Sequence, residues 1–316
     1  MAASYNTIVV LFMLVTLGFV LAKRKLFTEE VGNAFSKFVI NFALPLEIFL
    51  RITRDFNKAE LIEAFQEILL PLFTVIFLFI FGFFVSKILR IDNKQIGAFI
   101  LCFASPSAAF IGFPIVLGIY GDKGLPYALL YYVLTSLATW TVGVFLLNRD
   151  GNLINGIKTK FNIMRVFKEV LSPPVLGFLL GGIVVWIGWG VPTVFKSLFS
   201  YVGGMTSPLA MLFIGITIYQ TGFKKLRFSK EIVGILIGRY LVAPLIVIGL
   251  SAWLSVSPLM GAVCLIQASL PVSNTVAILT GERKIDVGFT DAALSYSLFL
   301  YLAIFPLLTK VIETVF

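Results

Sequence analysis

The amino-acid sequence predicts an all-α integral membrane protein, and its composition, its apolar runs and an internal repeat all point that way. Hydrophobic residues account for 59% of the 316 residues, charged residues for only 13%, and the mean hydropathy is +1.00. A typical soluble domain carries about 25% charged residues. This chain has too few charges to cover a surface that faces water, so lipid is the expected solvent for most of its exterior.

Ten apolar runs are each long enough to cross a bilayer as a helix, which takes about 20 residues. Short polar joints separate the runs, and the longest joint, about residues 148–168, is basic. No segment has the composition of a domain outside the membrane. The expected transmembrane helices, numbered 1 to 10 in chain order, lie near residues 5–22, 31–50, 68–88, 96–120, 125–147, 169–188, 197–220, 231–254, 258–280 and 289–312.

The expected orientation follows from the distribution of Lys and Arg. The joints after odd-numbered helices hold 17 of the 25 basic residues, whereas the even-numbered joints and the chain ends hold 6. Because basic loops stay cytoplasmic, both termini are expected on the extracytoplasmic side of the cell's plasma membrane. The same distribution accounts for the net charge of +9 without a nucleic-acid partner.

Residues that carry enzymatic or metal chemistry are sparse. Histidine is absent, which removes the usual general base and the commonest metal ligand. Cys102 and Cys264 both lie inside apolar runs without the spacing of metal ligands. The sequence therefore predicts no cofactor, no metal and no enzymatic activity, which argues against an intramembrane enzyme.

The two halves of the chain resemble each other. Residues 97–134 match residues 261–298 at 11 of 38 positions without a gap, which predicts two five-helix repeats, residues 1–150 and 151–316. Five is an odd number, so the second repeat enters the membrane from the opposite side. Inverted repeats of this kind are typical of secondary transporters.

Prolines interrupt helices 4 and 9 at corresponding places. Proline lacks a backbone donor and clashes with the carbonyl one turn back, and such breaks are tolerated only where protein or water surrounds them. We therefore expect helices 4 and 9 to be broken, to cross and to form a solute site, although small residues also serve close helix packing. The expected binding residues are Ser105, Pro106, Ser107, Gly112, Pro271, Ser273, Asn274 and Thr275.

Backbone amides freed after Pro106 and Pro271 are expected to help hold an anion at this site, because half-helix N-termini carry partial positive charge. Other polar residues in the runs could line a path to it, although such residues more often bond across helices. These expected lining residues are Gln267, Tyr132, Thr135 and Ser295.

Two ionisable residues inside the runs allow more than one interpretation. Glu47 could couple transport to a proton, or it could pair with Arg51, which follows at i+4. Arg239 could attract an anionic solute or pair with an acid such as Glu231. Its position about two turns from the start of helix 8 favours a third interpretation, in which the side chain snorkels to the interface.

The chain resembles the auxin efflux carrier family of membrane transporters, and in particular its bacterial dicarboxylate permease branch. Four short motifs carry the resemblance, and their order and spacing cover essentially the whole chain. These motifs are Asn41–Pro45, Ser105–Pro114, Met205–Gly215 and Leu270–Asn274. Where the plant carriers have an Asn seven residues before the second motif's final proline, this chain has Ser107. This difference and Glu47 both argue against an auxin-like substrate.

The resemblance implies that the ten helices form two domains with different roles. Helices 1, 2, 6 and 7 would form a scaffold that also makes a homodimer, and helices 3–5 and 8–10 would form a transport domain that moves as an elevator. The implied solute is a small organic anion such as malate or malonate. Two alternatives stay open: a cation–proton exchanger of related fold, which needs intramembrane Asp pairs that the crossover lacks, and a transporter-like membrane sensor.

Overall fold

The chain is helical throughout the part that the structure describes. A computed structural model describes residues 2–59, 62, 66–155, 164, 171, 173–221, 229–285 and 287–316. Every regular element in these ranges is a helix, and a single isolated antiparallel β-bridge joins Pro106 to Val272. The all-α prediction is therefore confirmed. Most of the expected basic joint 148–168, and Asp286 in the joint after helix 9, lie outside the described residues.

Five helical stretches of the described chain are long and apolar enough to cross a membrane. Their outward surface is apolar: on α5 (Leu69–Ile88), for example, Phe84 and Ile88 are largely exposed. Soluble monomers rarely expose large contiguous apolar patches, which supports a multi-pass membrane protein. The five stretches are Leu69–Ile88, Ala108–Ile154, Thr193–Gln220, Lys230–Leu254 and Gly288–Val315, and shorter apolar helices cover Val9–Lys23, Pro173–Ile187 and Pro258–Ala268.

The second of these stretches is too long for one crossing. Its 47 residues would extend roughly 70 Å as a straight helix, about twice the thickness of a bilayer. Gly121 interrupts it with a φ of +59°, a backbone conformation that favours glycine, at the position where a polar joint was expected. The stretch comprises η2 (Ala108–Gly112), α7 (Phe113–Tyr120), η3 (Gly121–Gly124), α8 (Leu125–Ala138), η4 (Thr139–Gly143) and α9 (Val144–Asn155).

The chain forms two compact units, and each unit takes segments from both halves of the sequence. The first unit comprises Met1–Gln66, Ala109–Leu129 and Leu171–Gly222, and the second comprises Glu67–Ala108, Leu130–Val170 and Phe223–Phe316. The inverted relation between the two five-helix halves stays a prediction.

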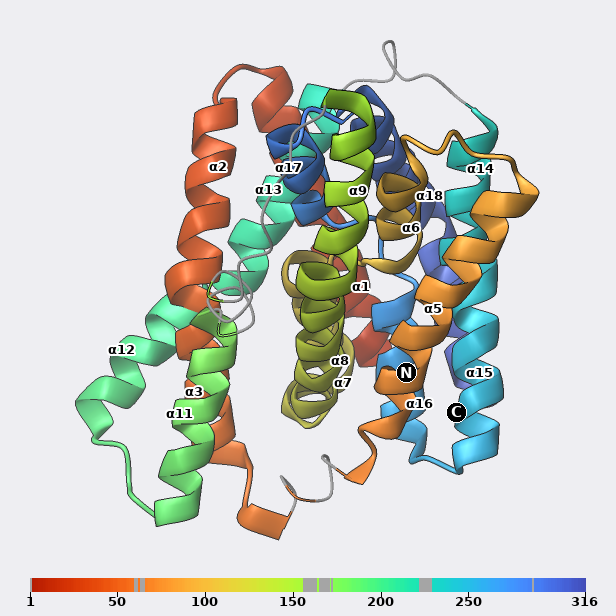
Figure 1. Cartoon of the computed structure of the whole chain (residues 1–316). Helices are drawn as coiled ribbons and strands as arrows, with labels where there is room; N and C mark the ends of the chain where they lie inside the picture. The colour runs from red at the N-terminus through yellow and green to blue at the C-terminus, as the bar shows by residue number, and fades with distance from the viewer. Residues whose placement is uncertain are drawn as a thin grey trace. The chain divides into compact units, whose positions relative to one another are not determined.

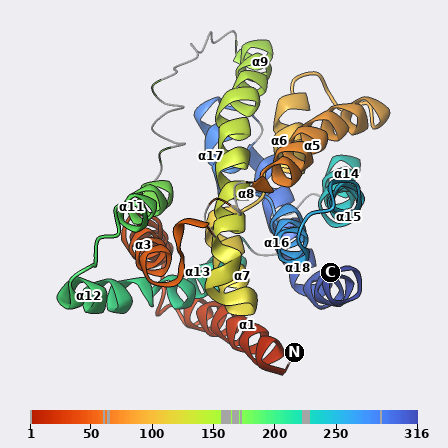
Figure 2. The ribbon, with the colours of Figure 1, turned by 90° about the horizontal axis from the view of Figure 1, so that it is seen from below.

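In the first unit, helices pack in close pairs (Figures 1 and 2). The helix α1 lies along α13, and α3 lies along α11. Glycine permits this approach, because a side chain at Gly18 would overlap the carbonyl of Leu212, and one at Gly177 would overlap that of Pro45. The elements of the unit besides α7 and η3 are α1 (Ala2–Lys23), α2 (Glu29–Phe38), η1 (Val39–Ala43), α3 (Leu44–Asp55), α11 (Pro173–Ile187), α12 (Thr193–Gly203) and α13 (Thr206–Thr221).

The expected helix 7, residues 197–220, differs from the structure. It begins earlier and consists of α12 and α13, which a turn at Gly204 and Met205 separates. Pro208 stands in the first turn of α13, where a missing backbone N–H leaves no hydrogen bond unmade.

In the second unit, α5 lies beside α15 and also contacts α6 (Figures 1 and 2). The N-terminus of α6 is buried, and the carboxylate of Asp150 accepts the amide of Ala98 there at 3.0 Å. Besides η4 and α9, the remaining elements of this unit are α6 (Ile96–Ala104), α14 (Lys230–Ile237), η6 (Gly238–Val242), α15 (Ala243–Leu254), α16 (Pro258–Ala268), α17 (Asn274–Glu282) and α18 (Val287–Val315).

Several helices contain a π-helical turn, and three of these turns come directly before a proline-bearing helix start. Pro45 follows η1, Pro114 follows η2 and Pro244 follows η6, each as the second residue after the turn. A proline ring clashes with the carbonyl four residues earlier, and the wider π turn moves that carbonyl aside while the helix continues.

Candidate functional site

Two helix interruptions lie side by side in the second unit. The helix α6 ends at Ala104, and Ser105 continues in an extended conformation. In the later segment, α16 ends at Ala268 and α17 begins only at Asn274. The intervening residues of both segments pair as short antiparallel strands through the bridge between Pro106 and Val272. The prolines therefore break both expected helices.

Backbone hydrogen bonds hold the two interruptions together. The amide of Ser107 donates to the carbonyl of Pro271 at 2.9 Å, and the amide of Ser273 donates to the carbonyl of Ser105 at 3.0 Å. The amide of Val272 donates to the hydroxyl of Ser297 on α18 at 3.0 Å. The expectation that the amides after the prolines are free for an anion is therefore wrong for these three, because each already has a protein partner.

Hydroxyl groups from neighbouring helices surround the paired interruptions. The hydroxyl oxygen of Ser105 lies 2.8 Å from that of Thr139, which belongs to the π-helical turn η4. The phenol of Tyr240 donates to the carbonyl of Ser297. Neither Thr139 nor Tyr240 is among the residues that the sequence predicts for the site, although Thr139 follows Thr135 by four residues and therefore shares its face of the helix.

The N-terminus of α17 presents polar groups that the fold leaves available. Ser273 caps the helix by accepting the amide of Thr275 at 3.3 Å. Ser273, Asn274 and Thr275 are each half-buried. Within the described part of the chain, the Asn274 side-chain amide and the buried Ser107 hydroxyl make no hydrogen bond. A polar solute could therefore bind these two groups without breaking a protein contact.

The other expected site residues are divided between the two units and differ in burial. Gln267, Thr135 and Ser295 are buried in the second unit, and Tyr132 there is half-buried. The Ser295 hydroxyl donates to the carbonyl of Asp291 in its own helix at 2.6 Å, as a structural serine often does. Gly112 and Glu47 belong to the first unit.

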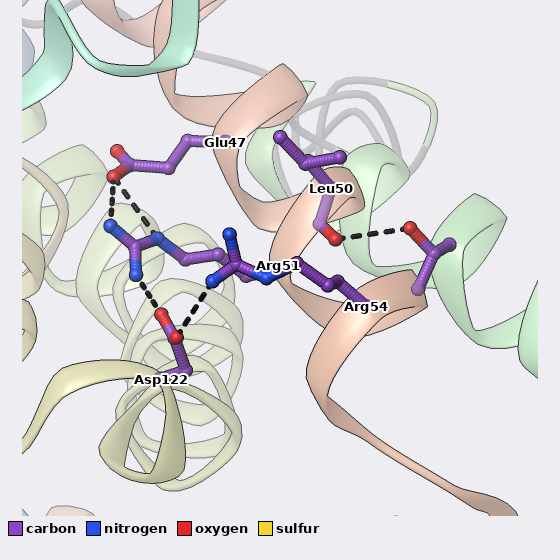
Figure 3. Close-up of polar contacts among 6 residues, drawn as sticks. Glu47, Leu50, Arg51, Arg54 and Asp122 are labelled. Atoms are coloured by element: carbon purple, nitrogen blue, oxygen red, sulfur yellow. Dashed lines mark hydrogen bonds and ion pairs between the residues drawn. The ribbon is translucent and has the colours of Figure 1, made fainter. Parts of the chain in front are cut away.

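Glu47 forms the ion pair that its spacing predicts. Its Oε1 atom accepts from Arg51 at 2.8 Å and 3.1 Å (Figure 3). Arg51 also contacts the carboxylate of Asp122, and Arg54 reaches the same carboxylate at 3.1 Å. Two carboxylates and two guanidinium groups thus balance their charges where α3 meets η3 in the first unit.

Arg239 does not snorkel to the interface. It lies in the π-helical turn η6 and is 0% exposed, which makes it the largest of the fully buried side chains in the described chain. No ion pair joins it to Glu231, and none of its three guanidinium nitrogens has a hydrogen-bond partner among the described residues. The snorkelling interpretation is wrong because the surrounding helices enclose the residue on all sides.

Comparison with known proteins decides the class of the molecule. A family model described as membrane transport protein matches residues 3–309 of the chain. The chain belongs to this family of transporters. The resemblance to the auxin efflux carrier type, drawn from four short motifs, is therefore confirmed.

Similar members of the membrane transport protein family come from archaea and bacteria. An uncharacterized transporter of Methanothermobacter thermautotrophicus is 29% identical over 314 residues, with 98% of each chain covered. The uncharacterized transporter MJ1031 of Methanocaldococcus jannaschii is 23% identical over 287 residues, covering 89% of this chain and 90% of its own. The uncharacterized transporter YfdV of Escherichia coli K12 is 25% identical over 303 residues, covering 94% of both chains.

As a membrane transport protein, the chain needs a place where a solute replaces water contacts with protein contacts. The paired interruptions supply irregular backbone away from lipid, together with the unengaged groups of Asn274 and Ser107. No other described segment combines a broken helix pair with available polar side chains.

Proposed function

We propose that this membrane transport protein is a secondary transporter of a small organic anion with the chemistry of malate or malonate. One observation carries the proposal: the interruptions of α6 and of α16–α17 are hydrogen-bonded to each other beside a half-buried asparagine that no described residue engages. Broken helices that meet in this way are typical of solute sites in secondary transporters.

Asn274 and Ser107 would hold the solute by hydrogen bonds to its carboxylate oxygens. The start of α17 adds partial positive charge at the same place, which favours an anion over a neutral solute. Thr275, in the first turn of α17, is also half-buried and would contact the solute. Pro106 and Pro271 would act indirectly, because they keep the two segments extended.

The movement in this proposal is an elevator-type alternating access, in which the second unit carries the bound solute. Its support is the division of the chain into two compact units, since α1, α3, α11 and α13 fall in the first and the paired interruptions in the second. The segment Ala109–Leu129 departs from the division that the family resemblance implies, because it belongs to the first unit. The protein in this proposal is a homodimer in the plasma membrane, and both of its termini are extracytoplasmic.

Uptake of radiolabelled malonate and malate into proteoliposomes tests the proposal, with and without an imposed proton gradient. We expect saturable uptake that unlabelled malonate competes and neutral malonamide does not. Asn274→Ala should reduce uptake to background. The control is Asn93→Ala, because Asn93 is an exposed residue in the joint between α5 and α6.

Three results would contradict the proposal. If the proteoliposomes accumulate neither malonate nor malate, the proposed organic-anion substrate is wrong. Sodium–proton exchange in the same vesicles would then favour the cation–proton exchanger. Malonate binding without any flux would favour a sensor. Full uptake by Asn274→Ala would move the site away from the start of α17.

A further inference from the structure

A buried positive charge in the second unit has no counter-charge among the residues with a described position. Arg239 lies ten residues into the helical stretch that begins at Lys230, so it stands about 14 Å from that end, near the middle of a bilayer core about 30 Å thick. Burying an unpaired charge costs several kcal/mol. An ionisable residue at this depth is accordingly a candidate functional site.

Among the residues that the structure describes, no carboxylate lies close enough to Arg239 to neutralise it. The ionisable side chains close enough to act on its charge are those of Tyr131 and Cys102, which are buried, and of Tyr240, which is half-buried. Each of these groups is ordinarily neutral at physiological pH. Within the described residues, the Nε, Nη1 and Nη2 atoms all lack a hydrogen-bond partner.

The neighbours of Arg239 connect it to the paired interruptions. Its chain neighbour Tyr240 donates a hydrogen bond to the carbonyl of Ser297, and the hydroxyl of Ser297 accepts the amide of Val272. On its other side, Gly238 packs against the ring of Phe103, which belongs to α6. Two hydrogen bonds therefore link Tyr240, the chain neighbour of Arg239, to the segment that precedes α17.

We propose that Arg239 is a carboxylate-binding residue of the second unit and supplies the counter-charge for the transported anion. A guanidinium group presents its donors in a planar fork that matches a carboxylate with two parallel hydrogen bonds. The inference rests on the proposed function and deepens it, since it names the residue that distinguishes an anion from a neutral solute.

Removal of the charge tests the inference before any transport is measured. A buried charge without a partner carries a desolvation cost that no attraction offsets, and an apolar residue of similar size at the same place does not. Solute-free Arg239→Met in detergent should therefore unfold at the same temperature as the wild type or higher. A structural arginine would give the opposite result, so a clear loss of thermal stability in Arg239→Met overturns the inference.

Binding and transport of malonate supply the second readout. Malonate should raise the unfolding temperature of the wild type and not that of Arg239→Met, and chloride at the same concentration should have no such effect. In proteoliposomes, we expect the KM for malonate to rise at least about tenfold in Arg239→Met. Arg239→Lys, which keeps the charge but loses the fork, should fall between the two.

The matched control is Lys230→Gln, which removes a positive charge from the same helical stretch. Lys230 is partly exposed and donates to the carbonyl of Leu89 at 2.7 Å, so malonate binding and KM should stay within about twofold of the wild type.

The two proposals fail in different ways. If the KM for malonate is unchanged in Arg239→Met, the proposed role of Arg239 is wrong, and the proposed transport of malonate is unaffected. Malonate binding that depends on Arg239 but leads to no uptake supports the residue's role and overturns transport. If chloride and malonate raise the unfolding temperature equally, Arg239 does not recognise a carboxylate, because chloride cannot accept two parallel hydrogen bonds from the guanidinium group.

Discussion

The hydroxyl oxygens of Ser105 and Thr139 lie 2.8 Å apart and are both buried. This contact ties the first residue of the interruption after α6 to the π-helical turn η4, which lies between α8 and α9. The hydrogen bond makes the position of the interruption depend on a neighbouring helix as well as on its own proline.

We expect Ser105→Ala and Thr139→Val each to lower the free energy of unfolding by about 1–2 kcal/mol, because each leaves one buried hydroxyl unpaired. The loss of unfolding free energy in the double variant should be smaller than the sum of the two single losses, by about 0.6 kcal/mol or more. Thermal unfolding of the four proteins in detergent measures this coupling. Strict additivity would show that the two hydroxyls do not interact.

Pro271→Ala should reduce malonate uptake by about tenfold or more while the protein still folds. The substitution restores a backbone N–H and removes the clash that keeps α16 from continuing, so the pairing with the segment after Ser105 weakens. Initial uptake rates in proteoliposomes give the measurement. Pro258→Ala is the control, because Pro258 is the first residue of α16, where a missing N–H is without consequence.

The offset of 164 residues that relates 97–134 to 261–298 also relates Gly18 to Gly182, yet the structure predicts different effects for their replacement by alanine. A side chain at Gly18 would overlap the backbone of Leu212, whereas one at Gly182 would meet nothing within 4 Å. Gly18→Ala should destabilise the protein by about 1–3 kcal/mol through overpacking. Gly182→Ala should leave the stability unchanged or raise it by up to about 1 kcal/mol. Thermal unfolding in detergent compares the two, and equal effects would argue against this packing of α1 on α13.

Asp122→Asn should destabilise the first unit more than Glu47→Gln. Asp122 contacts both Arg51 and Arg54, whereas Glu47 contacts only the first of these. Loss of Asp122 therefore removes a carboxylate contact from two guanidinium groups, whereas loss of Glu47 removes one from Arg51 alone. We expect about 1–3 kcal/mol for Asp122→Asn and about half of that for Glu47→Gln.

The same two variants separate a structural from a transport role for Glu47. If Glu47 carries a proton, Glu47→Gln abolishes the response of malonate uptake to an imposed proton gradient, and Asp122→Asn does not. The ion pair with Arg51 favours a structural role, for which both variants keep that response. Unfolding temperatures and gradient-driven uptake are measured on the same preparations.

Much of the helical content could be predicted from the sequence, because apolar length alone decides whether a segment can be solvated by lipid. The run 68–88 became α5 almost without change. Run 197–220 was less well predicted, since hydropathy does not register the turn at Gly204 and Met205. Both residues are compatible with an apolar run, and only the backbone shows the interruption.

The candidate site was predicted in part. Proline chemistry placed the interruptions at Pro106 and Pro271, but which amides would remain free depended on a partner segment 166 residues away in the chain. The backbone amides of Ser107 and Ser273 donate hydrogen bonds between the two segments. The polar group that stays available to a solute is the side-chain amide of Asn274. Such pairing is a long-range contact, for which a single sequence carries no signal.

The sequence by itself determined that this protein lives in lipid, is built of helices and breaks two of them at prolines, because these properties follow from composition and local backbone chemistry. Only the tertiary structure decided the state of the charged residues inside the membrane. Glu47 has a partner and Arg239 has none among the described residues, although both are single charges in apolar runs. Whether a charge is compensated depends on what other helices bring to it, and that is a property of packing.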